Sequence, residues 1–280
     1  MNMKKFFTTL TFLLLGFYVP VSTANEGIIS AGSSITELIV ALGQEKKLVA
    51  IDQTSQISNP GALPSIGYHR RLSAEGMLAL NADQLIGSNE LGPATTLNQL
   101  RAAGMKVEVV NTEPTAEGLL ERIDQIAKLT NATQNAKPLK KQVTDKINQL
   151  KQSHSQIPKK KILFLLIHQG RPANVAGANT TPNAIIELAG GINPAAASIE
   201  SYKPISTEAM VEMQPDIILI SGRNSQEMGG ADYVLKKMPL LAATPAGKNK
   251  QFIVIDGHAL VGGLGLNSLS EAFRINKLIQ

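Results

Sequence analysis

The segment SAEGMLALNAD (residues 73–83) is repeated as STEAMVEMQPD (residues 206–216). The first serine, the first glutamate, the methionine and the final aspartate are identical, and each copy runs into an apolar stretch that predicts a strand. The helical segments 37–43 and 184–190 form a second matched pair in the same order, and each ends in a glycine typical of a helix stop. Two matched pairs favour an internal duplication over chance similarity. We therefore expect two related lobes.

Short apolar runs alternate with amphipathic segments along the chain, which is the pattern of an α/β protein with mostly parallel strands. In the first lobe, residues 28–32 predict a strand. Ser33 or Ser34 is the expected cap of the helix that follows, and Gly43 is its expected end.

A long helical segment is expected between the lobes. Apolar residues keep helical spacing from about residue 116 to 154 without a strand signal, and Asn131 and Pro138 mark an expected break or kink. The expected parts are a signal peptide at residues 1–24, an N-terminal lobe at 25–112, a linking helical segment at 113–158 and a C-terminal lobe at 159–280. The predicted fold class is α/β, with two similar lobes whose central sheets are mostly parallel, a long linking helix and a ligand cleft between the lobes.

The N-terminal residues have the layout of a secretory signal. Lys4 and Lys5 precede an apolar run at 6–19, and small residues at 22–24 suit a signal peptidase. The run is shorter than the roughly 18–20 apolar residues that span a membrane. The chain has no cysteine, which excludes a disulfide or a lipid attached to a thiol. We expect a periplasmic protein that starts near Asn25 and has no lipid anchor.

The charge of the chain argues against nucleic acid as a partner. The formal net charge is +5, and it falls to +3 without Lys4 and Lys5. Much of the excess lies in lysines at residues 137–161, where no aromatic residues are interleaved. Nucleic-acid binding requires a basic face with stacking platforms or a recognisable reading motif. We interpret these lysines as a solvated helix face.

Residues 65–71, SIGYHRR, combine a tyrosine, a histidine and two arginines just after a proline-marked turn. The whole chain has only four tyrosines and four histidines. Neighbouring positive charge favours an ionised phenol, and tyrosinate is one of the few axial ligands of haem iron. The stretch therefore predicts either a solvated basic turn or an iron site at Tyr68.

In this order of motifs, the chain resembles the periplasmic binding proteins of ABC importers for haem, iron siderophores and cobalamin. The resemblance covers essentially the whole mature chain and rests on the segment at residues 33–38, on the helix-then-strand segments at Glu75 and Glu208, and on the linking helix. The turn at residues 67–71 looks like that of the haem-binding branch, whose members present a tyrosine ligand from this loop with a basic residue two positions later. The resemblance implies a binding protein, not an enzyme, with ferric haem as its transported ligand and Tyr68 as an axial iron ligand.

The resemblance also implies site residues in the second lobe. His168 follows the expected strand at residues 161–167 and would face Tyr68, either as a ligand of the same iron or of a second, stacked haem. Arginine forks suit carboxylates, and the expected contacts of the haem propionates are Arg70, Arg71, Arg223 and Arg171. Relatives often have a Gly-x-Gly-Pro-Arg loop near the C-terminus, whereas residues 263–267 read GLGLN, which puts a contact from this loop in doubt.

The implied partners are haem, an inner-membrane ABC permease dimer with its ATPase, and an outer-membrane haem receptor system. Glu75 and Glu208 occupy matching places in the repeat, each near the start of a helix. They are expected either to cap their helices electrostatically or to meet two equivalent basic sites on the permease dimer. The remaining histidines, His154 and His258, are expected surface residues.

Three other functions are alternatives to haem transport. A siderophore or cobalamin receptor would share the same scaffold. A receptor for free zinc or manganese needs three or four converging histidine and carboxylate ligands, and the chain has no histidine-rich loop. An enzyme is disfavoured because the sequence has no nucleophile elbow, phosphate loop or paired-carboxylate motif.

Overall fold

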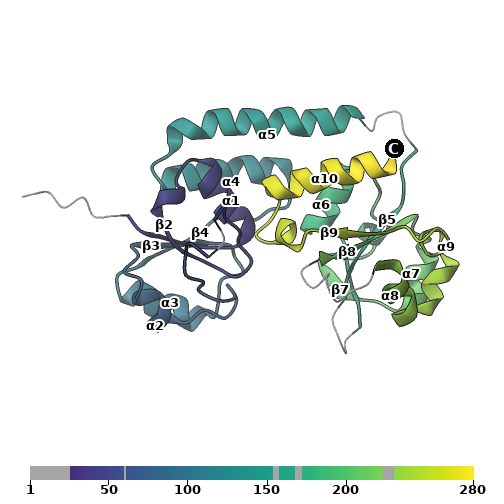
Figure 1. The fold of residues 1–280 in the computed structure, drawn as a ribbon, viewed down its shortest axis with the longest axis horizontal. Coiled ribbons are helices and arrows are strands. Elements are labelled where there is room, and N and C mark those ends of the chain that lie inside the picture. The colour runs from purple at the N-terminus through teal and green to yellow at the C-terminus, as the bar shows by residue number, and fades with distance from the viewer. Residues whose placement is uncertain (1–25, 60, 154–157, 168–171, 223–229) are drawn as a thin grey trace, which may run out of the picture.

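The computed structural model of the chain describes residues 26–59, 61–153, 158–167, 172–222 and 230–280 (Figure 1). Its first sheet has four parallel strands in the order β2-β1-β3-β4. They are β1 (Ile28–Ala31), β2 (Leu48–Ile51), β3 (Gln84–Gly87) and β4 (Lys106–Val109). The strand order reverses at β1, because β2 lies on one side of it and β3 on the other. Sheets of this kind bind ligands beyond the carboxyl ends of the strands at such a reversal.

The second sheet has five strands in the order β7-β6-β5-β8-β9. They are β5 (Ile162–Leu166), β6 (Asn174–Ala176), β7 (Tyr202–Pro204), β8 (Ile217–Ser221) and β9 (Phe252–Ile255). Strands β5, β8 and β9 are parallel, and β6 and β7 pair in antiparallel fashion at one edge. The predicted α/β class with mostly parallel sheets is confirmed. The two antiparallel strands were not predicted, because three residues each are too few to show an alternating pattern.

The helices have the following bounds: α1 (Ser33–Ala41), α2 (Ala74–Leu78), α3 (Ala94–Ala102), α4 (Ala116–Leu129), α5 (Thr133–Ser153), α6 (Thr181–Leu188), α7 (Thr207–Glu212), α8 (Gly230–Lys237), α9 (Pro245–Lys248) and α10 (Leu266–Ile279). The repeated segments form equivalent elements, α2 before β3 and α7 before β8. Helices α1 and α6 are each followed by a glycine in the left-handed region, Gly43 with φ +76° and Gly190 with φ +90°. Helices commonly end with a residue in the left-handed region, which glycine adopts without strain, and this explains why glycine occurs at both positions.

The linking segment is a pair of helices that lie above both sheets in Figure 1. Helices α4 and α5 are separated at Asn131, which has φ +58°. The prediction of a break at Asn131 is confirmed, whereas α5 continues through Pro138. Pro138 lies near the start of α5, where it removes a single backbone hydrogen bond, and the buried stripe that follows holds the helix in place. Among the described residues, no helix is long and apolar enough to cross a membrane.

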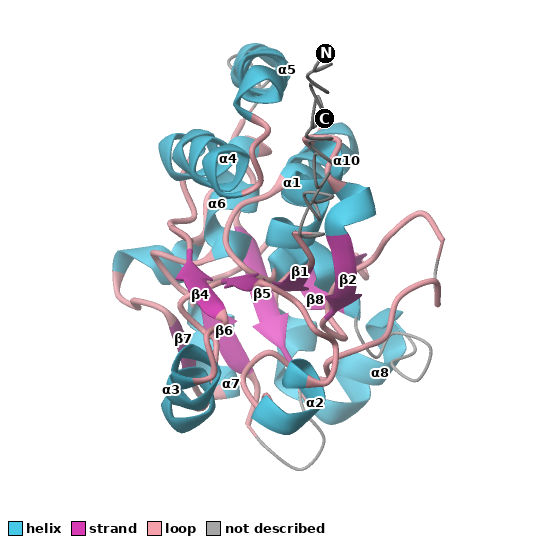
Figure 2. Cartoon of the chain, turned by 90° about the vertical axis from the view of Figure 1, so that its left-hand side faces the viewer, coloured by secondary structure: helices cyan, strands magenta, loops and turns pink. Residues whose placement is uncertain are grey.

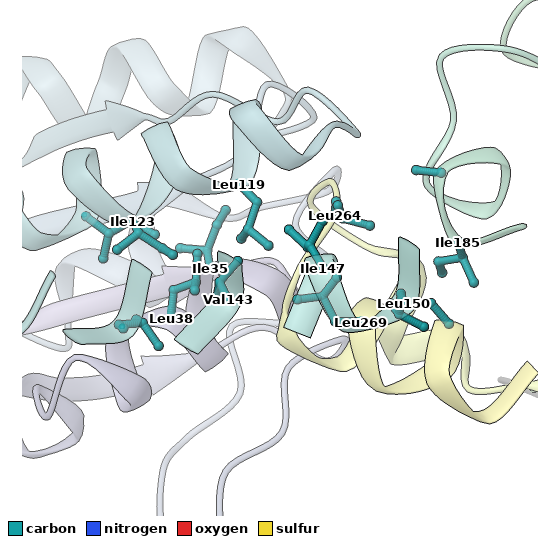
Figure 3. Packing of buried hydrophobic residues seen from close by; sticks show 14 of the residues in the cluster. Ile35, Leu38, Leu119, Ile123, Val143, Ile147, Leu150, Ile185, Leu264 and Leu269 are labelled. Carbon is teal, nitrogen blue, oxygen red and sulfur yellow. The ribbon is translucent and has the colours of Figure 1, made fainter. Parts of the chain in front are cut away.

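Helices cover both faces of the two sheets, and the two faces differ. Figures 1 and 2 show α1, α4, α5, α6 and α10 on one side of the sheets, with α2, α3, α7 and α8 on the other. On the first side, one continuous apolar core runs through both lobes (Figure 3). It includes Ile35, Leu38, Leu119, Ile123, Val143, Ile147, Leu150, Ile185, Leu264 and Leu269. Separating the lobes would expose part of this core, at a cost of about 25 cal/mol for each Å² of apolar surface.

Helix α10 is held by both lobes. The Glu37 carboxylate, from α1, accepts hydrogen bonds from the backbone N–H groups of Leu266 and Asn267 at 2.5 and 3.0 Å. Near the other end of α10, the Asn276 side chain donates to the Ala189 carbonyl, just after α6, at 3.0 Å. The sequence pattern predicted one connection between the lobes, and α10 is a second one.

The glycine-rich loop before α10 packs tightly on the first lobe. Ser34 does not cap α1; its hydroxyl instead donates to the Gly262 carbonyl, and no side chain caps this helix. The expectation of a serine cap is therefore wrong, because Gly32 occupies the cap position and the Ser34 hydroxyl is hydrogen-bonded to the loop instead. An added Cβ at Gly263 would overlap the Arg122 guanidinium, and one at Gly265 would overlap the Glu37 carboxylate. These glycines are needed for the close approach of the backbone.

Candidate functional site

The Tyr68 turn starts at the carboxyl end of β2 and crosses the end of the sheet. The Ile66 N–H donates to the Ile51 carbonyl at 2.9 Å, and the Gly67 carbonyl accepts from the Gln53 N–H at 2.9 Å. Gly67 has φ +78°, a conformation that favours glycine and turns the chain before Tyr68. The Tyr68 carbonyl then accepts from the Arg71 N–H at 2.7 Å, which closes a β-turn.

Asp52 lies beneath this turn and is 1% exposed. One carboxylate oxygen accepts from the Gly32 N–H at 3.1 Å and from the Ser55 hydroxyl at 2.6 Å. The other accepts from the Thr54 hydroxyl at 2.6 Å and lies 2.8 Å from Nδ1 of His69. Burial opposes ionisation of Asp52, but the hydrogen bonds from His69, Ser55 and Thr54 outweigh it and hold its pKa below the usual value.

His69 connects the loop after β2 with the loop after β3. Its side chain is 1% exposed; Nδ1 lies 2.8 Å from Asp52 Oδ2, and Nε2 lies 3.3 Å from Glu90 Oε2. Burial would lower the pKa of His69, but its hydrogen bonds to Asp52 and Glu90 raise it above the usual value. The His69 and Tyr68 rings are adjacent, with centroids 4.5 Å apart and an interplanar angle of 56°. Tyr68 itself is half-buried.

The two arginines after His69 differ in their surroundings. The Arg70 guanidinium donates to Glu90, on the oxygen that His69 does not use. The hydrogen bond from His69 and the charge of Arg70 hold the pKa of Glu90 below its usual value, although burial acts in the opposite direction. The Arg71 side chain is exposed at the edge of the turn. Of the two arginines predicted here as anion contacts, Arg70 is thus paired within the protein.

His258 joins the site from the second lobe, and the sequence did not predict this. It lies in the short 3-10 helix η5 (Gly257–Leu260), directly after β9, and is half-buried where a surface position was expected. Its Nδ1 is 2.6 Å from the carbonyl oxygen of Thr54, whose hydroxyl contacts Asp52. The segments that follow β9 and β2 therefore contact each other. No local pattern indicates this contact, since 204 positions separate the two residues.

A comparison with known proteins places the chain in a family. Residues 28–259 match the model of the family described as periplasmic binding protein. The chain belongs to that family. This periplasmic binding protein is 56% identical to the periplasmic haem-binding protein HutB of Vibrio cholerae, with a TM-score of 0.86 and coverage of 91% of this chain and 99% of that one.

Two further relatives differ in the ligand that their names state. The periplasmic haem-binding protein BhuT, solved in complex with two haems, is 29% identical, with a TM-score of 0.80 and coverage of 90% of this chain and 98% of that one. A vitamin B12-binding protein of Yersinia pestis is 26% identical over 216 residues, which is 76% of each chain. Family and structural neighbours are transport proteins, so this periplasmic binding protein is a binding protein and not an enzyme.

Three predicted site residues of this periplasmic binding protein lie outside the described residues: His168, Arg171 and Arg223. The strands before them are described. β5 ends at Leu166 and β8 at Ser221, so all three residues follow the carboxyl ends of parallel strands in sequence.

The two predicted docking residues are exposed and occupy equivalent positions. Glu75 lies in the first turn of α2 and Glu208 in the first turn of α7. Their caps differ, because Ser206 accepts a hydrogen bond from the Ala209 N–H at 3.2 Å while Ser73 makes no side-chain cap. Within the part of the chain that the structure describes, neither glutamate side chain forms a hydrogen bond or an ion pair; both lie at a helix start, where a carboxylate is favoured.

Proposed function

We propose that this periplasmic binding protein captures ferric haem and delivers it to an inner-membrane ABC permease. The observation that carries the proposal is the half-buried Tyr68, held on a hydrogen-bonded turn at the carboxyl ends of the strands where the sheet order reverses. The similarity to HutB over 91% of the chain supports haem as the ligand. Cobalamin has weaker support, from a relative with 26% identity.

In this proposal Tyr68 binds the haem iron as a phenolate, and apolar burial of the porphyrin supplies much of the binding free energy, at about 25 cal/mol per Å². His168 is the proposed second-lobe ligand, of the same iron or of a second haem. Arg71, Arg171 and Arg223 contact the propionates in this proposal. Arg70 can also contact a propionate, and to do so it would give up its hydrogen bond to Glu90.

A parallel titration with ferric haem and with cobalamin tests the ligand. The protein without residues 1–24 should give a Soret band with tyrosinate charge-transfer features on addition of haem, and no saturable change with cobalamin. Saturable binding of cobalamin without haem binding would contradict the proposal. His168→Ala should remove either six-coordinate character or a second equivalent of haem while the tyrosinate features survive; identical titrations would remove His168 from the site.

Delivery is proposed to use Glu75 and Glu208. Both are exposed and at equivalent places in the two lobes, so they suit two equivalent basic sites on a permease dimer. Charges at the rim of an interface act mainly on association, so charge reversal should slow uptake and leave haem affinity unchanged.

The test compares haem uptake by reconstituted transporter for Glu75→Arg, Glu208→Arg and the double variant. Glu117→Arg is the matched control, because Glu117 is an exposed glutamate in the first turn of α4, on the linking segment. Wild-type uptake in the double variant, or an equal loss in the control, would contradict docking through this pair.

The proposed location is the periplasm, reached through a cleavable signal peptide at residues 1–24. Family membership supports the location, and the basic and apolar pattern of residues 4–19 supports the signal. Mass spectrometry of the protein isolated from a periplasmic extract should give an N-terminus near Asn25.

A further inference from the structure

The Tyr68 turn is tied to the sheet by a row of four ionisable side chains. Asp52 follows β2, Glu90 follows β3, and His69 spans the gap between them. Asp52 also accepts from the Gly32 N–H after β1, so the row crosses the carboxyl ends of three adjacent strands. Arg70 completes it at the outer end by pairing with Glu90.

The geometry fixes the role of the imidazole ring. Each ring nitrogen faces a carboxylate oxygen, at 2.8 Å for Nδ1 and 3.3 Å for Nε2. The two contacts therefore hold the ring from opposite sides, one at each nitrogen. Asp52 and His69 are buried, whereas Glu90 and Arg70 form the partly exposed end of the row.

The His69 ring lies next to the Tyr68 ring. The two rings are neighbours in sequence and in space, with centroids 4.5 Å apart. The backbone on both sides of the pair is anchored, through the Gly67 carbonyl to Gln53 and through the His69 carbonyl to the Gly92 N–H at 3.0 Å. An imidazole ring clamped at both nitrogens cannot rotate, so it presents one fixed face to the phenol ring.

We propose that His69 is a positioning residue for Tyr68: clamped between Asp52 and Glu90, its ring holds the Tyr68 phenol in the single orientation that ligand binding requires. The proposal rests on the proposed haem function and names the groups that prepare its iron ligand. Outer hydrogen-bonding partners that orient a metal ligand typically alter affinity by about 10–100-fold.

Glu90→Gln is the central variant, because Glu90 is partly exposed and the change keeps its shape while it weakens the clamp at Nε2. Ferric haem bound to this variant should dissociate about 10-fold faster, with a shifted tyrosinate charge-transfer band. His69→Gln should act in the same direction. Glu200→Gln is the matched control, since Glu200 is an exposed glutamate in the second lobe that accepts a hydrogen bond from Asn179.

The double variant of His69 and Glu90 separates the clamp from the Glu90–Arg70 pair. If Glu90 acts through His69, the double variant should dissociate no faster than the worse single variant. Dissociation rates within about twofold of wild type in both single variants, or effects that simply multiply in the double variant, would overturn the proposal.

A measurement on the haem-free protein keeps this inference distinct from the proposed function. Only Tyr68, Tyr202 and Tyr233 remain after residue 24, so tyrosine-labelled protein gives an easily assigned aromatic NMR spectrum. Glu90→Gln retains the Tyr68 and His69 side chains, and among the tyrosine signals it should shift or broaden those of Tyr68 alone. Unchanged Tyr68 signals would contradict the positioning role even if haem binds. Failure of the wild type to bind haem, with the predicted NMR change present, would contradict the proposed function and leave the positioning role supported.

Discussion

Replacing Arg122 with methionine should weaken the connection between the lobes. Arg122 comes from α4, is fully buried, and donates from its guanidinium to the carbonyl oxygens of Asn111, Glu113 and Leu264. Two of these carbonyls precede α4, and the third lies in the loop before α10. One side chain therefore joins the first lobe, the linking segment and the C-terminal helix.

The magnitude follows from the buried carbonyl groups. Each one left without a donor costs about 1–3 kcal/mol, so three set an upper limit near 9 kcal/mol. Burial lowers the pKa of Arg122 to about 10 against the charges of Glu37 and Glu113, which shows that its burial is itself unfavourable. The methionine variant does not pay this desolvation penalty, which is several kcal/mol for a buried ion, so part of the loss of stability is offset. We expect a net loss of about 3 kcal/mol.

Urea unfolding followed by far-ultraviolet circular dichroism measures this loss. The slope with denaturant should stay unchanged while the midpoint falls. Arg101→Met is the matched control, because Arg101 is exposed near the end of α3 and, among the described residues, hydrogen-bonds only to Asn98, at 3.4 Å. It should change the free energy of unfolding by less than about 0.5 kcal/mol. A loss below about 1 kcal/mol for Arg122→Met would show that the three carbonyl groups do not depend on the guanidinium.

Three further predictions concern the same connection. Burial raises the pKa of Glu37 to about 7, so between pH 4.5 and 7 the folded state binds more protons than the unfolded chain. The free energy of unfolding should therefore fall as the pH rises over this range, by at most about 3 kcal/mol. Urea midpoints at both pH values check this, and Glu37→Gln should make the fall smaller. Gly265→Ala should lower stability by about 1–3 kcal/mol in calorimetry, because its Cβ overlaps the Glu37 carboxylate, whereas Gly104→Ala, with no neighbour near its Cβ, should show only the strain of its positive φ. Ile147→Ala should cost about 2–5 kcal/mol and lower one shared transition, and two separate transitions would contradict a core common to both lobes.

The sequence predicted the parts of the fold that local patterns encode. Apolar runs predicted strands β1, β2 and β5, and the repeat at residues 73–83 and 206–216 predicted two equivalent helix-strand units. The break at Asn131 followed from a residue type that tolerates a left-handed backbone. These features depend on residues within a few positions of one another.

The parts that were missed depend on residues far apart in sequence. Ser34 has the side chain of a helix cap, yet its hydroxyl pairs with a carbonyl 228 positions away. His69 and its two carboxylates are 17 and 21 positions apart, with no motif to join them. The sequence singled out Tyr68 because tyrosine, histidine and arginine are adjacent there. It could not show that His69 faces inward and Arg71 outward, because the turn that separates them is set by contacts to other strands.

Iron binding by Tyr68 is tested most directly by the resonance Raman and absorption spectra of the ferric haem complex, recorded for the wild type and for Tyr68→Phe. The wild type should show an iron–phenolate stretching band and a tyrosinate charge-transfer band. Both should be absent in Tyr68→Phe, which keeps the ring but lacks the ligating oxygen. The same bands in Tyr68→Phe, or their absence from the wild-type complex, would contradict the claim that Tyr68 binds the iron.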